Sequence, residues 1–337
     1  MPAKSIAIAL LLAISMIGVA RADTLANVKA RGLVLCGASP ETTGFSAIQV
    51  KGDWTGLGAD YCKGLAAVIF NDPSKVQFVT LQPGEQASAL ISGKIDALAD
   101  LIPWTLTSDT EQGLMFVGTM FYDGQGFLVT KASGLKSARD LAGKQVCVDA
   151  GGAAQANAAE YFDANNIAAK LVPIDGRDAA VAGYVAGTCA AYSANSSVLA
   201  GVRATLAAPA DHTILPDLIT KEPLSLAIKQ GDARWFDVTR WTLYGLLDAE
   251  ELGVTQGNVD ESLGSDNISI RRLLGVEGDF GGEIGLNKDW AYQLIKGVGN
   301  YADLYDRNVG DDSPLKLPRG LNALWNHGGI QYSPPVR

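Results

Sequence analysis

Apolar residues along this chain follow two spacings, which predict two kinds of element. Continuous apolar runs such as Leu33–Gly37 and Ala97–Leu101 are typical of strands buried on both faces. Between them, Leu57–Phe70 carries apolar residues at helical spacing and ends at Asn71-Asp72-Pro73. This alternation predicts an α/β fold with a mostly parallel sheet. Further strands are predicted at Val76–Leu81, Gln145–Val148 and Ala190–Ser193, and helices at Thr24–Arg31, Glu85–Ser92, Asp175–Gly187, Arg234–Leu252 and near 291–304.

Two loops that follow buried strands are the places where a ligand is expected. One opens after Ala97–Leu101 and runs through Trp104-Thr105. The other is the Gly151-Gly152 turn, which precedes a helix that begins near Ala153. Ligands of open α/β sheets sit at the carboxyl ends of the strands. Two such loops facing each other across a cleft predict a clamshell-shaped binding protein.

The chain is long enough for two lobes, because its 337 residues exceed one average domain. Extended stretches at 116–130 and 218–229 are expected to cross between the lobes. The predicted division is a signal segment at 1–22, lobe one at 23–129, lobe two at 130–225, and a return to lobe one with a C-terminal extension at 226–337. Each lobe is expected to be an open, mostly parallel sheet with flanking helices.

The first residues predict export. Lys4 precedes the apolar run Ile6–Val19, and Ala20-Arg21-Ala22 is a small-x-small cleavage site. The run is short for a membrane span, so a signal peptide cleaved near Ala22 is favoured over an uncleaved anchor helix. An exported protein is therefore expected.

Net charge excludes one class of partner. The formal charge is −9, and loss of Lys4 and Arg21 with the signal peptide makes it −11. Nucleic-acid binding needs clustered Lys and Arg, so no nucleic acid is expected as a partner.

Four cysteines indicate disulfides rather than a metal site. An even count in an exported chain is typical of disulfide bonds. Of the three possible pairings we favour one bond in each lobe, Cys36–Cys62 and Cys147–Cys189. Metal binding is the rival, but the sequence has no CxxC pair, and His212 and His327 stand alone. Neither a metal nor another cofactor is predicted.

Several long segments resemble one protein family. After the signal, the chain resembles the general L-amino-acid-binding periplasmic proteins of polar-amino-acid ABC importers (solute-binding protein family 3). The resemblance implies a two-lobed type II clamshell that closes on a small solute, docks as a monomer on an inner-membrane ABC permease, and carries the favoured cysteine pairing. The matching segments are KARGLVLCG (29–37), GFS (44–46), ADYCKGLAAVIF (59–70), WTLTSDT (104–110), FYDGQGFLV (121–129), ITKEPL (219–224), GDARWFDVTRWTLYGLLDAEELGVT (231–255), GDFGGEIGLNKDWAYQLIKGVGNY (278–301) and RGLNALWNHGGIQYSPPVR (319–337).

The ligand-gripping residues depart from the family pattern. The resemblance implies an arginine for the solute carboxylate where this chain has Ser108, and a Thr-Thr pair where it has Gly152-Ala153-Ala154. Asn195 stands in place of an aspartate that holds the ammonium group. Losing an arginine–carboxylate contact weakens binding at least tenfold. The predicted ligand-binding residues are Phe45, Asp100, Trp104, Thr105, Ser108, Asp149, Gly152, Ala153 and Asn195.

We therefore expect the cleft to favour a neutral or cationic solute over a zwitterionic amino acid. Phe45 and Trp104 are predicted as apolar or cation–π walls, and Asp100, Asp149 and Asn195 as polar partners. Each aspartate could instead be a solvated loop residue or a helix cap, and Trp104 could be core packing. The loop alignment allows an offset of one or two residues. Arg177 in lobe two is a possible substitute for the lost arginine.

Two alternatives stay open. The first is an exported enzyme on the same fold, similar to cyclohexadienyl dehydratases, in which pocket carboxylates act as general acids. Asp100 and Asp149, if they face each other, are the candidates for that role. The sequence lacks a Gly-x-Ser-x-Gly elbow, an HExxH motif and a phosphate loop, so an enzyme is not favoured. The other alternative is a ligandless paralogue that acts through a protein partner.

Overall fold

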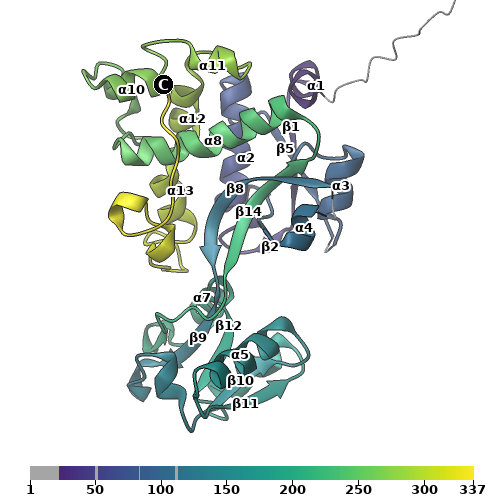
Figure 1. The fold of residues 1–337 in the computed structure, drawn as a ribbon, viewed down its shortest axis with the longest axis vertical. Coiled ribbons are helices and arrows are strands. Elements are labelled where there is room, and N and C mark those ends of the chain that lie inside the picture. The colour runs from purple at the N-terminus through teal and green to yellow at the C-terminus, as the bar shows by residue number, and fades with distance from the viewer. Residues whose placement is uncertain (1–22, 50–51, 83, 111–112) are drawn as a thin grey trace, which may run out of the picture.

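The computed structural model describes residues 23–49, 52–82, 84–110 and 113–337, which form two α/β bodies joined by paired strands (Figure 1). We call the lower body in Figure 1, built on a five-stranded sheet, lobe two. The upper body is lobe one, and it includes the C-terminal part of the chain. The predicted signal peptide lies outside the described residues.

Lobe one holds a parallel sheet and an antiparallel sheet. In the parallel sheet, β1 (Val34–Ala38) lies between β5 (Val76–Thr80) and β6 (Ala97–Leu98). The strand predicted at Ala97–Leu101 is shorter than expected. After β6 the chain leaves this sheet, and β7 (Ile102–Pro103) pairs with another one. The carboxyl ends of β1 and β6 therefore meet the start of the connection to lobe two.

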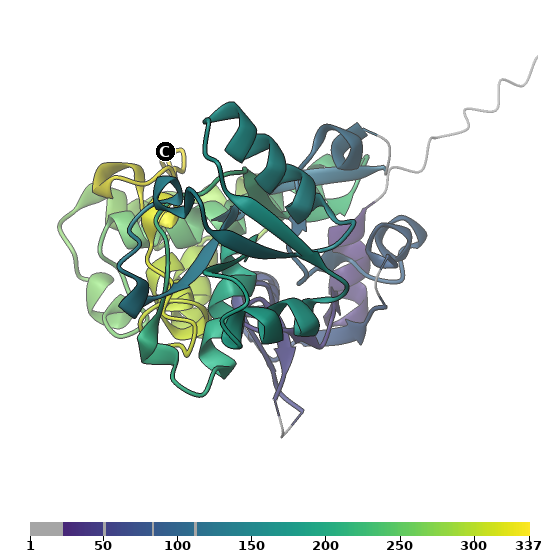
Figure 2. The ribbon, with the colours of Figure 1, turned by 90° about the horizontal axis from the view of Figure 1, so that it is seen from below.

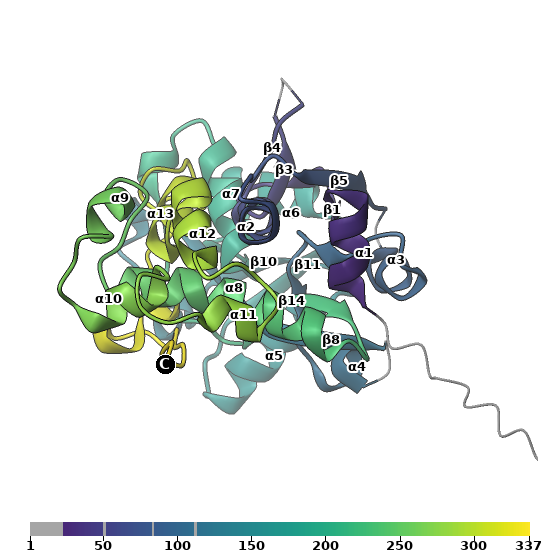
Figure 3. The same ribbon diagram turned by 90° about the horizontal axis from the view of Figure 1, so that it is seen from above.

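Helix α2 (Leu57–Phe70) forms the centre of lobe one, with the bounds that the apolar spacing predicts. Nearly all its residues are buried, and Figure 3 shows it almost end-on among other helices. Gly58 permits its close approach to the end of β6, because a Cβ there would lie 1.6 Å from the Ala99 carbonyl oxygen.

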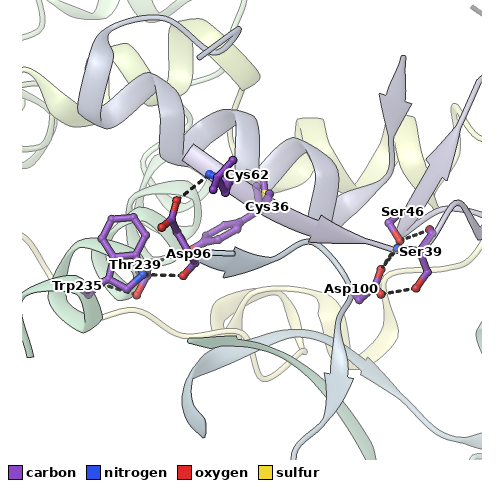
Figure 4. Close-up of a disulfide and its surroundings, with 10 residues drawn as sticks. Cys36, Ser39, Ser46, Cys62, Asp96, Asp100, Trp235 and Thr239 are labelled. Atoms are coloured by element: carbon purple, nitrogen blue, oxygen red, sulfur yellow. Dashed lines mark hydrogen bonds between the residues drawn. A yellow bond between two sulfur atoms is a disulfide. The ribbon is translucent and has the colours of Figure 1, made fainter. Parts of the chain in front are cut away.

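Helix α8 (Ala233–Glu251) spans lobe one and confirms the predicted amphipathic helix. The Asp232 side chain caps it by accepting from the Trp235 backbone N–H at 3.0 Å. The Trp235 indole Nε1–H donates to the Asp96 carbonyl oxygen at 2.9 Å, as Figure 4 shows. These contacts join α8 to the parallel sheet.

Smaller elements complete lobe one. A short antiparallel ribbon consists of β2 (Glu41–Thr42), β3 (Ser46–Ile48) and β4 (Trp54–Thr55). The other helices are α1 (Thr24–Arg31), α3 (Gln86–Ser92), α4 (Leu106–Thr110), α9 (Val259–Ser262), α10 (Ile268–Leu273), α11 (Phe280–Glu283), α12 (Trp290–Val298), α13 (Tyr301–Asn308), η4 (Gly320–Asn322) and η5 (Trp325–His327).

Lobe two is one mixed sheet with helices on both faces. The strand order is β11 (Lys170–Ile174), β10 (Gln145–Asp149), β12 (Ala191–Asn195), β9 (Gln125–Thr130) and β13 (His212–Ile214). The first three strands run parallel, and β9 is antiparallel to both neighbours.

The helices of lobe two divide between the two faces of its sheet. Helix α5 (Ala153–Ala164) covers one face, while α6 (Arg177–Val185) and α7 (Ser196–Thr205) cover the other. Figure 2, seen from below, shows this sheet with helices on either side. Three short helices complete the lobe: η1 (Lys131–Ser133), η2 (Ala138–Leu141) and η3 (Pro209–Asp211).

Two long strands connect the lobes. Strands β8 (Leu114–Asp123) and β14 (Glu222–Lys229) pair antiparallel along their length, and β14 also pairs with β7. The chain passes from β8 into β9 at Gly124, so the predicted extended stretch 116–130 is two strands. The predicted domain limits after residues 129 and 225 stay predictions.

Both predicted disulfides are present, one in each lobe. Cys36–Cys62 joins β1 to α2 across 26 residues, and Cys147–Cys189 joins β10 to the segment before β12 across 42 residues. Loops of these lengths correspond to about 3–4 kcal/mol of stabilisation each in the chain-entropy model. Over the described ranges, no helix has the length and apolarity that crossing a membrane requires.

Candidate ligand-binding cleft

A cleft of about 670 Å³ lies between the two lobes. Its floor in lobe one comes from the loops after β1 and β6, and its opposite wall comes from the start of α6 and from α7 along its length. The lobe-one residues are Ser39, Thr43, Phe45, Gln86, Asp100, Leu101, Ile102, Leu224, Pro314 and Leu315, and the lobe-two residues are Arg177, Ser197, Val198, Gly201, Val202, Ala204 and Thr205.

Asp100 lines the cleft as predicted, but its carboxylate is already hydrogen-bonded. It accepts from the Ser39 backbone N–H at 2.8 Å and from the hydroxyls of Ser39 and Ser46 at 2.5 and 2.6 Å. Figure 4 shows the two serines converging on this carboxylate. The residue is buried, so the serines hold the carboxylate and the loop after β1 in one arrangement.

Phe45 also lines the cleft as predicted. Its ring is buried and packs edge-on against Phe121 of β8, with centroids 5.1 Å apart. This strand leads to lobe two, so Phe45 joins the cleft floor to the interlobe connection. It presents an apolar surface fixed by core packing.

The Trp104–Ser108 loop lies outside the cleft lining. The Trp104 ring stacks on Phe116 at 5.2 Å and is partly exposed. Thr105 and Ser108 form a reciprocal cap at the start of α4: Ser108 Oγ accepts from the Thr105 N–H at 2.9 Å, and Thr105 Oγ1 accepts from the Ser108 N–H at 3.1 Å. Ser108 Oγ also donates to the Pro103 carbonyl oxygen. The Ser108 hydroxyl, at the position where the resemblance implies an arginine, is thus engaged within its own loop.

The predicted lobe-two residues lie at the carboxyl edge of the sheet but outside the cleft lining. Gly152 and Ala153 begin α5, and Asn195 occupies the N-cap position of α7 without a side-chain cap. Asp149 ends β10, and its Oδ1 atom is buried with no hydrogen-bond partner among the described residues. In the described conformation, only Phe45 and Asp100 of the nine predicted residues line the cleft.

Arg177, considered in the sequence only as a substitute, does line the cleft. It begins α6, directly after strand β11, and its side chain is exposed. The charges of Arg177 and Asp149 both affect the pKa of Tyr192, in opposite directions. Burial and the Asp149 carboxylate raise the pKa of the Tyr192 hydroxyl to about 12, and Arg177 opposes that rise. Arg177 and Asp149 therefore both lie close enough to Tyr192 to influence its hydroxyl.

One face of α7 forms most of the lobe-two wall. This contribution of α7 was not predicted from the sequence. The available signal was the strand at 190–193, because the helix after a parallel strand begins at the ligand edge. Within α7, Arg203 donates to the carbonyl oxygens of Leu315 and Lys316 in lobe one. The C-terminal part of the chain thus contributes to the cleft and contacts its opposite wall.

The connection beside the cleft carries two neighbouring carboxylates. Asp123 accepts from the backbone N–H of Gly124 at 2.8 Å and from the Ser197 hydroxyl, so it ties β8 to α7. Burial raises the pKa of Asp123. Glu222 lies opposite it in the strand pair, and burial together with the Asp123 charge raises the pKa of Glu222.

No candidate metal-binding site is found in the part of the chain that the structure describes. No group of three His, Cys, Asp or Glu side chains there is arranged to hold an ion. The dehydratase alternative requires Asp100 and Asp149 to face each other, but Asp149 does not line the cleft with Asp100.

Comparison with solved structures defines the class of fold. A periplasmic binding protein of an ABC transporter from Brucella ovis, solved with glutathione bound, is 49% identical and superposes with a TM-score of 0.80 over 94% of this chain and all of that one. An ancestral cationic amino-acid solute-binding protein is 25% identical, with a TM-score of 0.54 over 68% of this chain and 97% of that one. The fold is that of a type II periplasmic binding protein.

Comparison with curated proteins defines the family. The general L-amino acid-binding periplasmic protein of Rhizobium johnstonii is 47% identical over 94% of both chains. The glutamate/glutamine/aspartate/asparagine-binding protein of Rhodobacter capsulatus is 43% identical over 99% of this chain and 98% of its own. No family model matches the sequence. The chain belongs to the periplasmic amino-acid-binding proteins of ABC transporters, the solute-binding components of importers.

Proposed function

We propose that this protein captures a neutral or cationic solute derived from amino acids, rather than a free zwitterionic amino acid, and delivers it to an ABC permease. It acts as a monomer in the periplasm after its signal peptide is cleaved near Ala22. It binds its solute without catalysing a reaction.

The charges at the cleft are the observation that carries this proposal. Asp100 and Arg177 are the charged residues among the described cleft lining, one on each wall. Asp149 ends β10 outside the cleft lining, and its charge, like that of Arg177, acts on Tyr192, so it adds a second negative charge at the lobe-two edge. Two carboxylates against one guanidinium disfavour an anionic solute and accommodate a neutral or cationic one.

The lobe-one loop supports the same proposal. Ser108 is hydrogen-bonded to Thr105 and Pro103, so it offers no charge to a solute carboxylate. The relative solved with glutathione bound supports a solute larger than a free amino acid. Glutathione has two carboxylates and one ammonium group, so that relative supports the size of the solute and not its charge. The ancestral cationic amino-acid-binding protein supports a cationic solute on this fold.

Closure of the two lobes is the proposed mechanism. The strand connections at Gly124 and before Glu222 absorb the backbone change, and the solute shifts the population toward the closed form. The contact of Arg203 with Leu315 and Lys316 links the walls in the described conformation. The closed surface is then recognised by the permease.

A thermal-shift panel tests this proposal. The mature protein is heated with each standard amino acid, with amino-acid amides, with diamines and with glutathione, each at 100 µM. A neutral or cationic compound is expected to raise the melting temperature by several degrees, because a ligand that binds only the folded state stabilises it. Stabilisation by standard zwitterionic amino acids alone, at micromolar dose, overturns the proposal.

A further inference from the structure

We infer that the solute is a short peptide that lies along α7, with its amino end toward Asp100 and its carboxylate toward Arg177. This inference rests on the proposed function and narrows it to one class of net-neutral solute. Three features of the cleft support it: the placement of the two charges, the open face of α7, and the lobe-one amide of Gln86.

The two charges of the cleft lie on opposite walls and are not paired. Asp100 follows β6 in lobe one, while Arg177 begins α6 in lobe two. Neither has an ion-pair partner within 4.0 Å in the described ranges. A free amino acid carries its ammonium and carboxylate on adjacent carbons, so it fits a site where their partners converge. A peptide carries the same two charges further apart, so its two ends can reach partners on separate walls.

Most of the lobe-two wall is a single helical face. Ser197, Val198, Gly201, Val202 and Thr205 line the cleft, at the spacing of residues that share one side of a helix. Val198 and Val202 make this face largely apolar, which suits the side chains and backbone carbons of a peptide. The cleft volume of about 670 Å³ lies in the range of sites that hold ligands larger than one amino acid.

Gly201 leaves open space on the face of α7 that lines the cleft. It lies in the interior of α7, where glycine lowers helix stability relative to alanine. Its φ angle is not among the positive values that require glycine. A Cβ at this position would meet no atom within 4 Å. The missing side chain therefore leaves room for an extended backbone to approach the helix.

Gln86 is the polar group best placed for a peptide bond. Its amide oxygen accepts from the Gly84 N–H at 3.0 Å, which orients the side chain. Its Nε2 lies 3.5 Å from Asp100, at the limit of a hydrogen bond, so the amide remains free to donate to a carbonyl oxygen. This donor lies beside the carboxylate that would hold the amino end.

Isothermal titration of the mature protein tests the inference. The probes are alanine, alaninamide, dialanine, trialanine, trialanine amide and N-acetyl-trialanine. Dialanine or trialanine is expected to bind at least 100-fold more tightly than alanine, and N-acetylation or amidation to weaken binding about tenfold each. Arg177→Gln should weaken trialanine about tenfold and leave trialanine amide unchanged.

A pair of helix variants tests the position of the peptide. Gly201→Leu should abolish trialanine binding while its melting temperature stays equal to or above that of the parent, because leucine is the better helix former. Ala159→Leu, on the exposed face of α5, adds the same bulk away from the cleft and should leave binding unchanged. Unchanged peptide binding in Gly201→Leu overturns the inference.

The outcomes separate this inference from the proposed function. Binding of alaninamide or another cationic single residue, without binding of any peptide, overturns the peptide inference and supports the proposed function. Binding of zwitterionic alanine alone overturns both. Absence of binding by every probe overturns the peptide inference and points to the ligandless alternative.

Discussion

The two walls of the cleft differ in how their polar groups are engaged. In lobe one, Asp100 accepts three short hydrogen bonds from Ser39 and Ser46, and Ser108 is held in a helix cap. In lobe two, Arg177 is exposed without an ion pair, and Gly201 faces open space. The lobe-one wall is organised before a solute arrives, whereas the lobe-two wall leaves its groups available.

Buried atoms show the same contrast. In the described residues of lobe two, Asp149 Oδ1 and Tyr192 Oη are buried without a hydrogen-bond partner. Buried polar atoms normally find partners, so each such atom calls for an explanation. The two atoms lie on β10 and β12, whose carboxyl ends face the cleft. The difference teaches that the polar groups next to the cleft are more fully hydrogen-bonded in lobe one than in lobe two.

The largest expected effect comes from breaking the organised wall. Asp100→Ala removes the acceptor for three hydrogen bonds, and the free energy of unfolding should fall by about 3 kcal/mol, because hydrogen bonds to a charged group are worth more than neutral ones. Urea denaturation measures the change. Gln86→Ala is the control, since its contact with Asp100 is 3.5 Å long, and it should cost less than about 0.5 kcal/mol. A similar loss in both variants contradicts the assigned role of Asp100.

Lobe one has one exception to the contrast, at Asp248 on α8. Its Oδ1 accepts from the Ser333 hydroxyl at 2.5 Å, while its buried Oδ2 has no partner among the described residues. Burial, helped by the Glu251 charge, raises the pKa of Asp248 from 3.8 to about 7. The pKa of Asp248 is therefore higher in the folded state than in the unfolded state. Protonated Asp248 contributes its full stabilisation below about pH 3.8, and this stabilisation is lost as the pH rises through 7.

Asp248→Asn should therefore stabilise the protein at pH 8, by about 2 kcal/mol, because it removes a buried charge. The gain should shrink toward pH 4, where the folded aspartate keeps its proton. Denaturant titrations at pH 5 and pH 8 measure both values. Glu261→Gln removes an exposed charge and should give no comparable pH dependence. An equal gain at both pH values would show that the proton on Asp248 is not the cause.

The smallest effect distinguishes two tyrosines of lobe two. The Tyr184 hydroxyl lies 2.6 Å from His212 Nδ1, whereas the Tyr192 hydroxyl has no partner within the described residues. Tyr184→Phe should lower the unfolding free energy by about 1 kcal/mol, and Tyr192→Phe should change it by less than about 0.5 kcal/mol. Thermal unfolding of the solute-free protein compares them. Equal losses would mean that the Tyr192 hydroxyl is engaged after all.

The elements with the strongest local patterns could be predicted from the sequence. Helix α2 has the predicted bounds, because its apolar spacing and the breaker after Phe70 both act locally. The strand at Ala97–Leu101 was predicted too long. Its last residues are apolar enough for a strand, but the chain turns there to pair with β14 in another sheet, which local sequence does not encode.

The cleft was harder to predict than the fold. Asp100 lies at the carboxyl end of the strand predicted at Ala97–Leu101, and Phe45 lies in the loop that follows the strand predicted at Leu33–Gly37, so both were expected at the ligand edge. Ser108 has the residue type of a ligand contact, yet it closes a helix cap because Thr105 stands three residues before it. The wall formed by α7, with Gly201 at its centre, required the position of lobe two relative to lobe one.

The sequence by itself determined the strand–helix alternation, the cysteine pairs and the family, since these depend on local pattern or on long matched segments. Only the tertiary structure decided which groups share the cleft. Arg177 and Asp100 are 77 residues apart in the chain and meet at one cleft because two sheets present their carboxyl edges to each other. The engagement of each side chain depends on neighbours that folding supplies, so it cannot be read from the residue type alone.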